Sequence, residues 1–301
     1  GGRCLHFLSY AHRERKEAFP PFHKRKEKVS PEIYRRVEKI LEEEQYVTHM
    51  GARMLSAGGS GLIALILTYK RIEKESITED PFVSSVIGAV QLALQEKGYF
   101  LLLYSNPDME ECVRISREWN VDGIILLGAK REGYYKIKES LSVPVVSIDT
   151  PFSAEDKDYV NVGLKDYEAA KEMTKYLLSM GHRKIAFFSL TEGGELLEKH
   201  YIDSERYRGY KDAMEEEGLS AGVWHNLSFT EEWRKKQYLS FYEERFFHAT
   251  ALFVTADIMA LEMMRFCMDR GISIPEQLSI AGFDGIKAGR CMHPMLTTME
   301  Q

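Results

Sequence analysis

Residues 29–67, VSPEIYRRVEKILEEEQYVTHMGARMLSAGGSGLIALIL, join a helical segment to a buried strand. Ser30 as N-cap and Pro31 at the first helical position predict the start of a helix. The apolar residues that follow have helical spacing: Ile33, Val37, Ile40 and Leu41. The glycine-rich stretch 58–61 then leads to the apolar run Leu62–Leu67, which predicts a buried strand. The stretch therefore predicts a small helical unit attached through a glycine-rich hinge to an α/β body.

Apolar runs that predict strands alternate with amphipathic patterns that predict helices along the rest of the chain. Strands are predicted at 62–67, 99–104, 123–127, 143–148, 159–162, 184–189, 223–229, 250–254 and 278–282. Helices are predicted at 82–97, 109–119, 132–140, 166–180, 203–217, 231–245 and 257–270. Near-continuous apolar strands separated by helices indicate parallel sheets covered on both faces. Because the series restarts after the turn-rich residues 151–158, we expect an α/β fold of two doubly wound, Rossmann-like subdomains, 61–158 and 159–290.

Charge is distributed unevenly along the chain, whose formal net charge is −6. Residues 1–60 contain 12 Lys and Arg against 8 Asp and Glu, whereas the remaining residues contain 28 against 38. A basic end on an acidic body indicates a segment that faces nucleic acid. A solvated basic helix without a partner would have the same composition, so charge alone leaves both interpretations open.

Several protein classes are disfavoured by the sequence. Four scattered cysteines form no CxxC pair and predict reduced thiols in a cytoplasmic protein: Cys4, Cys112, Cys267 and Cys291. No apolar run approaches the roughly 18 residues of a membrane span, and residues 1–10 do not form a secretory signal. The string GAKREG at 128–133 lacks the Lys and Ser/Thr of a P-loop, and no catalytic triad or metal-binding motif is found. We therefore expect neither an enzyme nor a metal or cofactor site.

An ordered set of motifs resembles the LacI/GalR family of transcriptional regulators. The strings VSPEI at 29–33 and GARML at 51–55 are similar to the family's third DNA-domain helix and its hinge helix. Further strings follow in family order: DPF at 80–82, WNVDGIILLG at 119–128, VPVVSIDT at 143–150, GHRKIAFF at 181–188, SERYRGY at 204–210, FVTADIMALEMM at 253–264, SIPEQLSIAGFDGI at 273–286 and MHPMLTTMEQ at 292–301. GHRKIAFF is the most specific of these in the body.

This resemblance implies a function as well as a fold. It implies two subdomains like those of periplasmic binding proteins, with residues 291–301 crossing back to join the first subdomain. It also implies a sequence-specific regulator, most often a repressor, that binds operator DNA as a homodimer. A small-molecule effector, a sugar or sugar derivative, would bind between the subdomains and change the affinity for DNA by allostery.

Candidate effector-binding residues lie at strand ends. Asp149 and Asp284 each follow a buried strand, and ligands bind outside the carboxyl ends of strands in open parallel sheets. The planar guanidinium of Arg206 is suited to hydroxyls, a carboxylate or a phosphate. Phe82 would form an apolar wall, and Asp257 is a further candidate contact. Carboxylates and a guanidinium facing one cleft suit the vicinal hydroxyls of a sugar.

Each candidate has a structural alternative. The two strand-end aspartates would cap neighbouring helices or turns. Arg206 would form a surface ion pair with Glu205 or Asp203, and Asp257 is favoured as the N-cap of a helix at 258–270. If Arg206 instead contacts the effector, Arg206→Ala is expected to abolish the response while leaving folding nearly intact.

Candidate DNA-binding residues precede the glycine-rich hinge. Ser30 at a helix N-terminus and Tyr46 just past the helix end are placed to hold phosphates. In the family a hinge-helix leucine is inserted into the minor groove and kinks the duplex, and Leu55, beside Arg53, occupies that position. The alternative for Leu55 is plain packing within a short helix.

Residues 1–24 depart from the family pattern, and a shifted reading frame would explain the change. Pro20 and Pro21 fall in the middle of the family's recognition helix, where proline costs roughly 3 kcal/mol or more. We expect an irregular segment at 1–24 and a remnant DNA-binding domain at 25–60. We also expect weak, salt-sensitive, poorly specific DNA binding, in the range of roughly 10⁻⁴–10⁻⁶ M that is typical of non-specific contacts. Family members continue past the position of Gln301, so we also expect an incomplete body. Two alternatives stay open: a sugar-binding module, and a dimerisation partner that has lost specific DNA binding.

Overall fold

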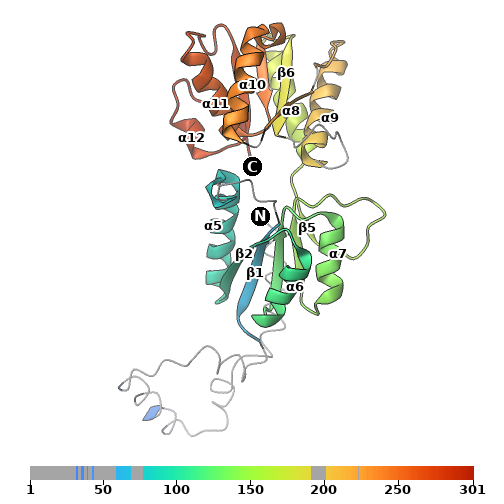
Figure 1. Cartoon of the computed structure of the whole chain (residues 1–301), viewed down its shortest axis with the longest axis vertical. Coiled ribbons are helices and arrows are strands. Elements are labelled where there is room, and N and C mark those ends of the chain that lie inside the picture. The colour runs from blue at the N-terminus through green and yellow to red at the C-terminus, as the bar shows by residue number, and fades with distance from the viewer. Residues whose placement is uncertain are drawn as a thin grey trace. The chain divides into compact units, whose positions relative to one another are not determined.

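The computed structural model describes residues 32, 35, 36, 39, 43, 59–68, 77–190, 201–222, 224–228 and 230–301. The chain divides into two compact units, the first comprising Gly1–Lys70 and Ser85–Gly163 and the second Arg71–Ser84 and Leu164–Gln301. Each unit contains a five-stranded sheet whose strand pairings are parallel (Figure 1). The prediction of an α/β fold with two doubly wound subdomains is confirmed.

The sheet of the first unit has the strand order β2-β1-β3-β4-β5. Its strands are β1 (Leu62–Leu67), β2 (Phe100–Ser105), β3 (Gly123–Leu127), β4 (Val145–Ile148) and β5 (Asn161–Val162). Between β1 and β4 the sequence forms the 3-10 helix η2 (Ile77–Glu79) and the helices α5 (Pro81–Glu96), α6 (Met109–Glu118) and α7 (Arg131–Ser140). The register places Leu65 of β1 between Leu103 of β2 and Ile125 of β3.

The sheet of the second unit has the strand order β10-β9-β8-β6-β7. Its strands are β6 (Ile185–Leu190), β7 (Trp224–Leu227), β8 (Ala251–Val254), β9 (Ser279–Asp284) and β10 (Thr297–Glu300). The helical elements of this unit are α8 (Asp166–Ser179), α9 (Tyr201–Glu216), α10 (Glu231–Glu243), η3 (Arg245–His248), α11 (Asp257–Met268) and α12 (Lys287–Arg290).

Both sheets have the same topology when the strands are counted within each unit. The first strand of each unit lies between the second and the third, so the crossovers run in opposite directions from that point. Open parallel sheets bind ligands outside the carboxyl ends of the strands at such a switch point. The switch points lie between β1 and β3 in the first unit and between β6 and β8 in the second.

The core of the first unit is built on strands that are apolar on both faces. Every residue of β1 and of β3 is buried. Helices α6 and α7 contribute Val113 and Ile137 to the apolar cluster that packs on these strands. Asp108 starts α6 as its N-cap by accepting a hydrogen bond from the Glu110 N–H at 2.9 Å.

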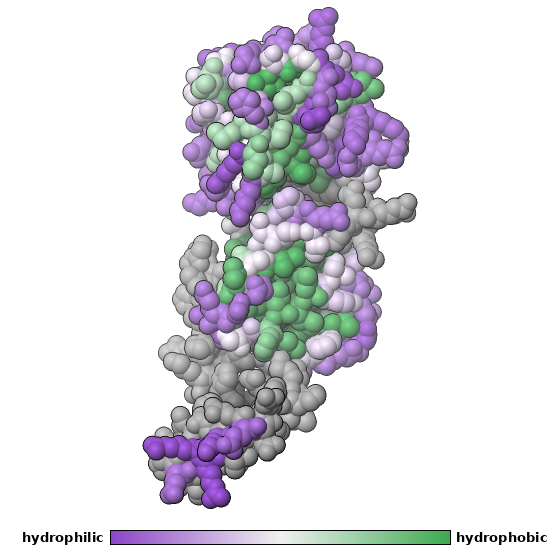
Figure 2. Space-filling model, turned by 90° about the vertical axis from the view of Figure 1, so that its left-hand side faces the viewer, coloured by the Kyte–Doolittle hydropathy of each residue, from purple (hydrophilic) through white to green (hydrophobic). Residues whose placement is uncertain are grey.

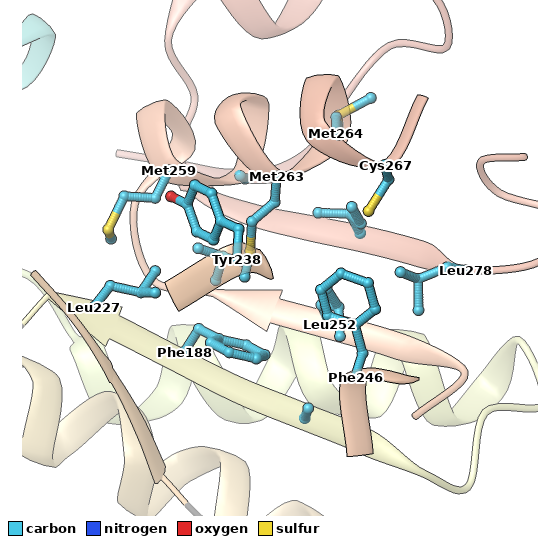
Figure 3. Packing of buried hydrophobic residues seen from close by; sticks show 14 of the residues in the cluster. Phe188, Leu227, Tyr238, Phe246, Leu252, Met259, Met263, Met264, Cys267 and Leu278 are labelled. Carbon is cyan, nitrogen blue, oxygen red and sulfur yellow. The ribbon is translucent and has the colours of Figure 1, made fainter. Parts of the chain in front are cut away.

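Two apolar clusters cover the two faces of the second sheet. Successive strand residues point to opposite faces, so Phe187 packs with α8 and α9 while Phe188 packs with α10 and α11. Figure 3 shows the second of these clusters, with Tyr238 of α10 and Met263 of α11 above Phe188 and Leu252. Full burial of each such side chain contributes roughly 1.5–3 kcal/mol.

Two strands belong to a different sheet from the one that the sequence predicts. Residues 159–162 are expected in the second subdomain, but β5 pairs with β4 in the first sheet. Residues 291–301 are expected to join the first subdomain, but β10 pairs with β9 in the second sheet. Both are short edge strands, and their sequences carry no periodicity that specifies a neighbour. The first unit therefore ends at Gly163 rather than at residue 158.

Candidate functional site

The carboxyl ends of β8 and β9 in the second unit carry a group of polar side chains. Thr255 follows β8, and Asp284 is the last residue of β9. Arg206, from the second turn of α9, contacts the backbone at the end of β8 and the aromatic ring of Phe283. This is the side of the second sheet where its switch point predicts ligand binding.

Arg206 is held in a fixed position by three contacts. Its Nε donates to Asp166 Oδ1 at 2.8 Å, and its Nη1 donates to the Thr255 carbonyl at 2.7 Å. The guanidinium also lies over the Phe283 ring, 3.7 Å from the ring centroid, which is a cation–π contact. No hydrogen bond from Nη2 is found among the described residues. The guanidinium is thus oriented by the protein, and the two hydrogen bonds use two of its five N–H groups.

The alternative of a surface ion pair for Arg206 is wrong. Glu205 pairs with Arg208, and Asp203 accepts a hydrogen bond from the Thr255 hydroxyl at 2.9 Å. The partner of Arg206 is Asp166, at the first position of α8, and both side chains are more than nine-tenths buried. Sequence reasoning missed Asp166 because nothing in the local pattern links the start of α8 to α9.

Burial of this ion pair also corrects the expectation that Arg206→Ala leaves folding nearly intact. Only 7% of Arg206 is exposed, and the same holds for the Asp166 side chain. Removing one partner of a buried pair leaves an uncompensated charge and costs about 3–5 kcal/mol. Arg206→Ala therefore tests the stability of the second unit as much as any ligand contact.

Asp284 has an unusual backbone conformation and environment. Its φ of 128° lies in the left-handed region, which non-glycine residues adopt at a cost and often at functional sites. The carboxylate accepts hydrogen bonds from the Asp257 N–H at 3.2 Å and from Gln301 Nε2 at 2.7 Å. Burial raises the pKa of Asp284 to about 7, although the nearby Arg206 guanidinium lowers it. The carboxylate thus receives an N–H from the first turn of α11, as the capping alternative expects, and it also lies beside Arg206.

Asp257 has a structural role, because its buried carboxylate is hydrogen-bonded within the protein. It is fully buried, and its carboxylate accepts hydrogen bonds from the Ile286 N–H at 2.9 Å and the Thr298 hydroxyl at 2.6 Å. Burial raises the pKa of this carboxyl. Ala256 is the N-cap of α11 and Asp257 the first helical residue, so the predicted cap is displaced by one position. The full burial of Asp257 argues against direct contact with an effector and indicates that it braces the turn after Asp284.

Close approach of β9 to Asp257 explains the glycine of the GFD motif. A Cβ at Gly282 would overlap the Asp257 carboxylate and would also press on Leu296. Only glycine leaves room for the buried carboxylate at this point of the strand. The motif thus combines a glycine that admits Asp257, a phenylalanine that stacks on Arg206 and an aspartate at the sheet edge.

Asp149 lies at the corresponding edge of the first sheet. It follows β4 with a φ of 56°, and its N–H donates to the Val162 carbonyl at 2.9 Å. The next residue, Thr150, is 2% exposed, and in the described part of the chain its hydroxyl oxygen has no hydrogen-bond partner. Asn161 binds the backbone of Thr150 on both sides, with its Oδ1 accepting from the N–H and its Nδ2 donating to the carbonyl, each at 3.1 Å. No pattern in the sequence identifies Thr150 or Asn161 as part of a candidate site.

The structure brings together Arg206, Asp257 and Asp284 in the second unit. Asp149 belongs to the first unit. Phe82 lies in the first turn of α5 and is partly exposed, and the preceding Asp80 caps that helix by accepting from the Val83 N–H at 3.0 Å. Contact of Asp149 and Phe82 with the same small molecule as Arg206 stays a prediction.

The predicted DNA-binding residues Ser30, Tyr46, Arg53 and Leu55 lie outside the described residues, as does the segment 1–24. Within the stretch that predicts the basic helix, five exposed helical residues are described: Glu32, Arg35, Arg36, Lys39 and Glu43. Lys39 Nζ lies 3.6 Å from Glu43 Oε1, one turn later. Their helical state agrees with the predicted helix.

Metal-binding clusters and membrane-spanning helices are both absent from the ranges that the structure describes. No group of three or more His, Cys, Asp or Glu side chains there is placed to hold a metal ion. None of the helices in these ranges is long and apolar enough to cross a membrane.

Comparisons with known proteins place the chain among regulators of transcription. Residues 174–301 match the periplasmic binding protein-like domain family. The transcriptional regulator MalR of Clostridium butyricum is 25% identical over 284 residues, which cover 87% of this chain and 77% of that protein. The ribose operon repressor of Haemophilus influenzae is 28% identical over 283 residues, covering 91% and 79%. These matches support a LacI/GalR family regulator.

Solved structures agree with this conclusion about the fold. The regulator CelR in complex with cellobiose superposes with a TM-score of 0.69 at 20% identity and covers 91% of this chain and 80% of that one. A LacI-family sugar-binding regulator from Escherichia coli, complexed with phosphate, gives a TM-score of 0.62 at 21% identity, covering 80% and 84%. The predicted resemblance to LacI/GalR regulators is confirmed, and the relatives are transcriptional regulators rather than enzymes.

Proposed function

We propose that this transcriptional regulator is a repressor whose affinity for operator DNA is controlled by a carbohydrate effector. In this proposal the effector contacts Phe82, Arg206 and Asp284 in the second unit and Asp149 in the first. The relatives support both halves of the proposal, since they include an HTH-type regulator and a ribose operon repressor, and one structural neighbour is a complex with cellobiose.

The arrangement of Arg206 beside Asp284 is the observation on which this proposal depends. A guanidinium that stacks on Phe283 lies next to a carboxylate at the edge of a parallel sheet where ligands bind. Vicinal hydroxyls can accept from the one and donate to the other, so the pair matches a polyol better than an apolar ligand. The left-handed backbone at Asp149 and at Asp284 adds support, because such strained residues concentrate at functional sites.

The proposal includes a homodimer. Apolar side chains gather on the α5 and β2 side of the first unit (Figure 2), and among them Leu92 is 60% exposed, Phe100 54% and Leu103 41%. A second copy of the chain is the partner that we propose for this face, since twofold dimers match palindromic operators.

A thermal-shift screen tests the effector half of the proposal. The full chain is heated with sugars, sugar phosphates and nucleosides, and a ligand at 100 times its dissociation constant should stabilise the protein by about 2.7 kcal/mol. Asp284→Asn should lose this shift, whereas Asp269→Asn, on the exposed end of α11, should keep it. No shift with any carbohydrate, or an equal shift in Asp284→Asn, contradicts the proposed site.

A dimerisation partner without specific DNA binding is the second candidate function. It is favoured by Pro20 and Pro21, which lie where the family has its recognition helix. Selection of duplexes from a random pool distinguishes the two functions. Enrichment of one sequence supports the repressor, and recovery of unrelated duplexes supports the second candidate.

A further inference from the structure

The chain enters the first sheet through Gly59, Ser60 and Gly61, a segment that we call the connector. The carboxylate of Asp122 holds it at two points, with the Ser60 N–H donating to Oδ1 and the Gly61 N–H donating to Oδ2, each at 2.8 Å. The Ser60 hydroxyl adds a longer hydrogen bond to Oδ1, at 3.4 Å. Asp122 directly precedes β3, so the connector to β1 is held by the neighbouring strand.

Backbone hydrogen bonds fix the surroundings of this contact. The Gly61 carbonyl accepts from the Phe100 N–H of β2, and the Leu62 carbonyl accepts from the Asp122 N–H, both at 2.8 Å. The Leu62 N–H donates to the Ser60 hydroxyl at 3.0 Å. The connector is therefore bonded to both neighbours of β1, and Ser60 is only 6% exposed. Charge-assisted hydrogen bonds of this kind are about twice as strong as neutral ones.

Steric constraints explain why residue 59 is a glycine. A Cβ at Gly59 would lie 2.9 Å from Asp122 Oδ1, closer than real Cβ atoms approach a neighbour. The glycine-rich sequence here permits a close backbone approach to a carboxylate. Residues 59–61 are thus fixed to the sheet, in contrast to the hinge that their composition predicts.

We propose that Asp122 is a positioning residue that anchors the connector and so couples the effector-binding body to the DNA-facing residues before it. This inference rests on the proposed function. Without the anchor, three consecutive small residues would let the preceding segment reorient independently of the sheet. With the anchor, a movement of this end of the sheet is passed to the chain at Ser60. Asp122 is not placed to contact the proposed effector, since it lies at the amino end of its strand.

Amide hydrogen exchange in the full chain tests the anchor. The variants are Asp122→Ala, Asp122→Asn, and the control Asp108→Ala, which removes a carboxylate that caps α6 in the same unit. In Asp122→Ala the amides of Ser60 and Gly61 should exchange about tenfold faster, while that of Leu65 in β1 stays protected. Asp122→Asn, which keeps one acceptor oxygen, should release one of the two amides more than the other. Unchanged protection in Asp122→Ala, or an equal loss in Asp108→Ala, overturns the anchor.

A DNA measurement then tests the coupling. The probe is the duplex that the wild-type chain enriches from a random pool, and its affinity for each variant is measured by fluorescence anisotropy. Asp122→Ala should change that affinity by about fivefold or more, and Asp108→Ala should leave it unchanged. Equal affinities in all three proteins overturn the positioning role. If the wild-type chain enriches no duplex, the repressor function and the coupling role both fail, and the exchange data decide the anchor alone.

Discussion

Replacement of Arg206 by methionine should strongly destabilise the second unit. The substitution removes hydrogen bonds to Asp166 and Thr255 and the contact with Phe283, and it leaves the Asp166 carboxylate buried without its cation. An uncompensated buried charge of this kind costs about 3–5 kcal/mol. Asp166→Asn keeps an acceptor oxygen for the guanidinium, so its cost should be smaller, at about 1–3 kcal/mol. The double variant Arg206→Met/Asp166→Leu should be more stable than Arg206→Met alone, because no buried charge is left.

Urea unfolding followed by tryptophan fluorescence measures these differences. In a Trp119→Phe background the two remaining tryptophans, Trp224 and Trp233, lie in the second unit, so the signal reports on that unit. The single variant Asp166→Leu completes a double-mutant cycle with the parent, Arg206→Met and the double variant, and the coupling energy of the pair follows from this cycle. An Arg206→Met variant within about 0.5 kcal/mol of its parent, which is the usual range for surface substitutions, would refute this reasoning.

The other predictions concern pH, packing, assembly and DNA binding. Burial raises the pKa of Asp284 from 3.8 to about 7, and its charged neighbours are Arg206, Asp257 and Asp80. Between pH 3.8 and about 7, the folded state therefore binds more protons than the unfolded state. The free energy of unfolding should therefore fall as the pH rises from about 4 to about 7, and Asp284→Asn should lose this part of the fall in urea titrations at a series of pH values. Gly282→Ala should destabilise the second unit by roughly 1–3 kcal/mol, because the added Cβ overlaps the Asp257 carboxylate. Gly88→Ala is the control, since a Cβ there meets no other atom within 4 Å, and it should stabilise α5 by about 0.5–1 kcal/mol. Thermal unfolding measures both changes. Leu92→Glu should shift a dimer towards monomers in analytical ultracentrifugation. Leu239→Glu on α10 is the control, since this leucine is also exposed, at 43%, and its replacement should leave the dimer intact. A wild-type monomer at micromolar concentration contradicts the proposed dimer face. DNA binding should be weak, with a dissociation constant of roughly 10⁻⁴–10⁻⁶ M, and the affinity should fall steeply with salt. Nanomolar binding of one duplex in physiological salt would show that the interpretation of residues 1–24 is wrong.

Strand and helix positions were accessible from the sequence because their patterns are local. Leu62–Leu67 and Gly123–Leu127 are uninterrupted apolar runs, and they form β1 and β3 with those limits. The edge strands β5 and β10 were placed in the wrong subdomain, because pairing partners of short segments depend on contacts distant in sequence. Periodicity identifies a strand but does not say which strand lies beside it.

In the candidate site too, local sequence patterns identified some residues, whereas contacts between residues distant in sequence were missed. Asp149 and Asp284 were identified from their place after buried strands, and the structure adds the left-handed backbone of both. Asp166, the partner of Arg206, was missed because 40 residues separate the two in sequence. The structural role of Asp257 depends on β10, whose place in the sheet was also unpredicted. Three-dimensional neighbours, rather than residue types, decide which aspartates are free to bind a ligand.

A measurement of DNA affinity with and without the sugar found by the thermal-shift screen tests the central claim most directly. The probe is the duplex enriched by the wild-type chain, and the comparison protein is Asp284→Asn. Control by an effector at the Arg206–Asp284 site predicts that saturating sugar changes the dissociation constant of the wild-type complex by about fivefold or more. The same sugar should leave the Asp284→Asn complex unchanged. A wild-type dissociation constant that is the same with and without the sugar would contradict the account.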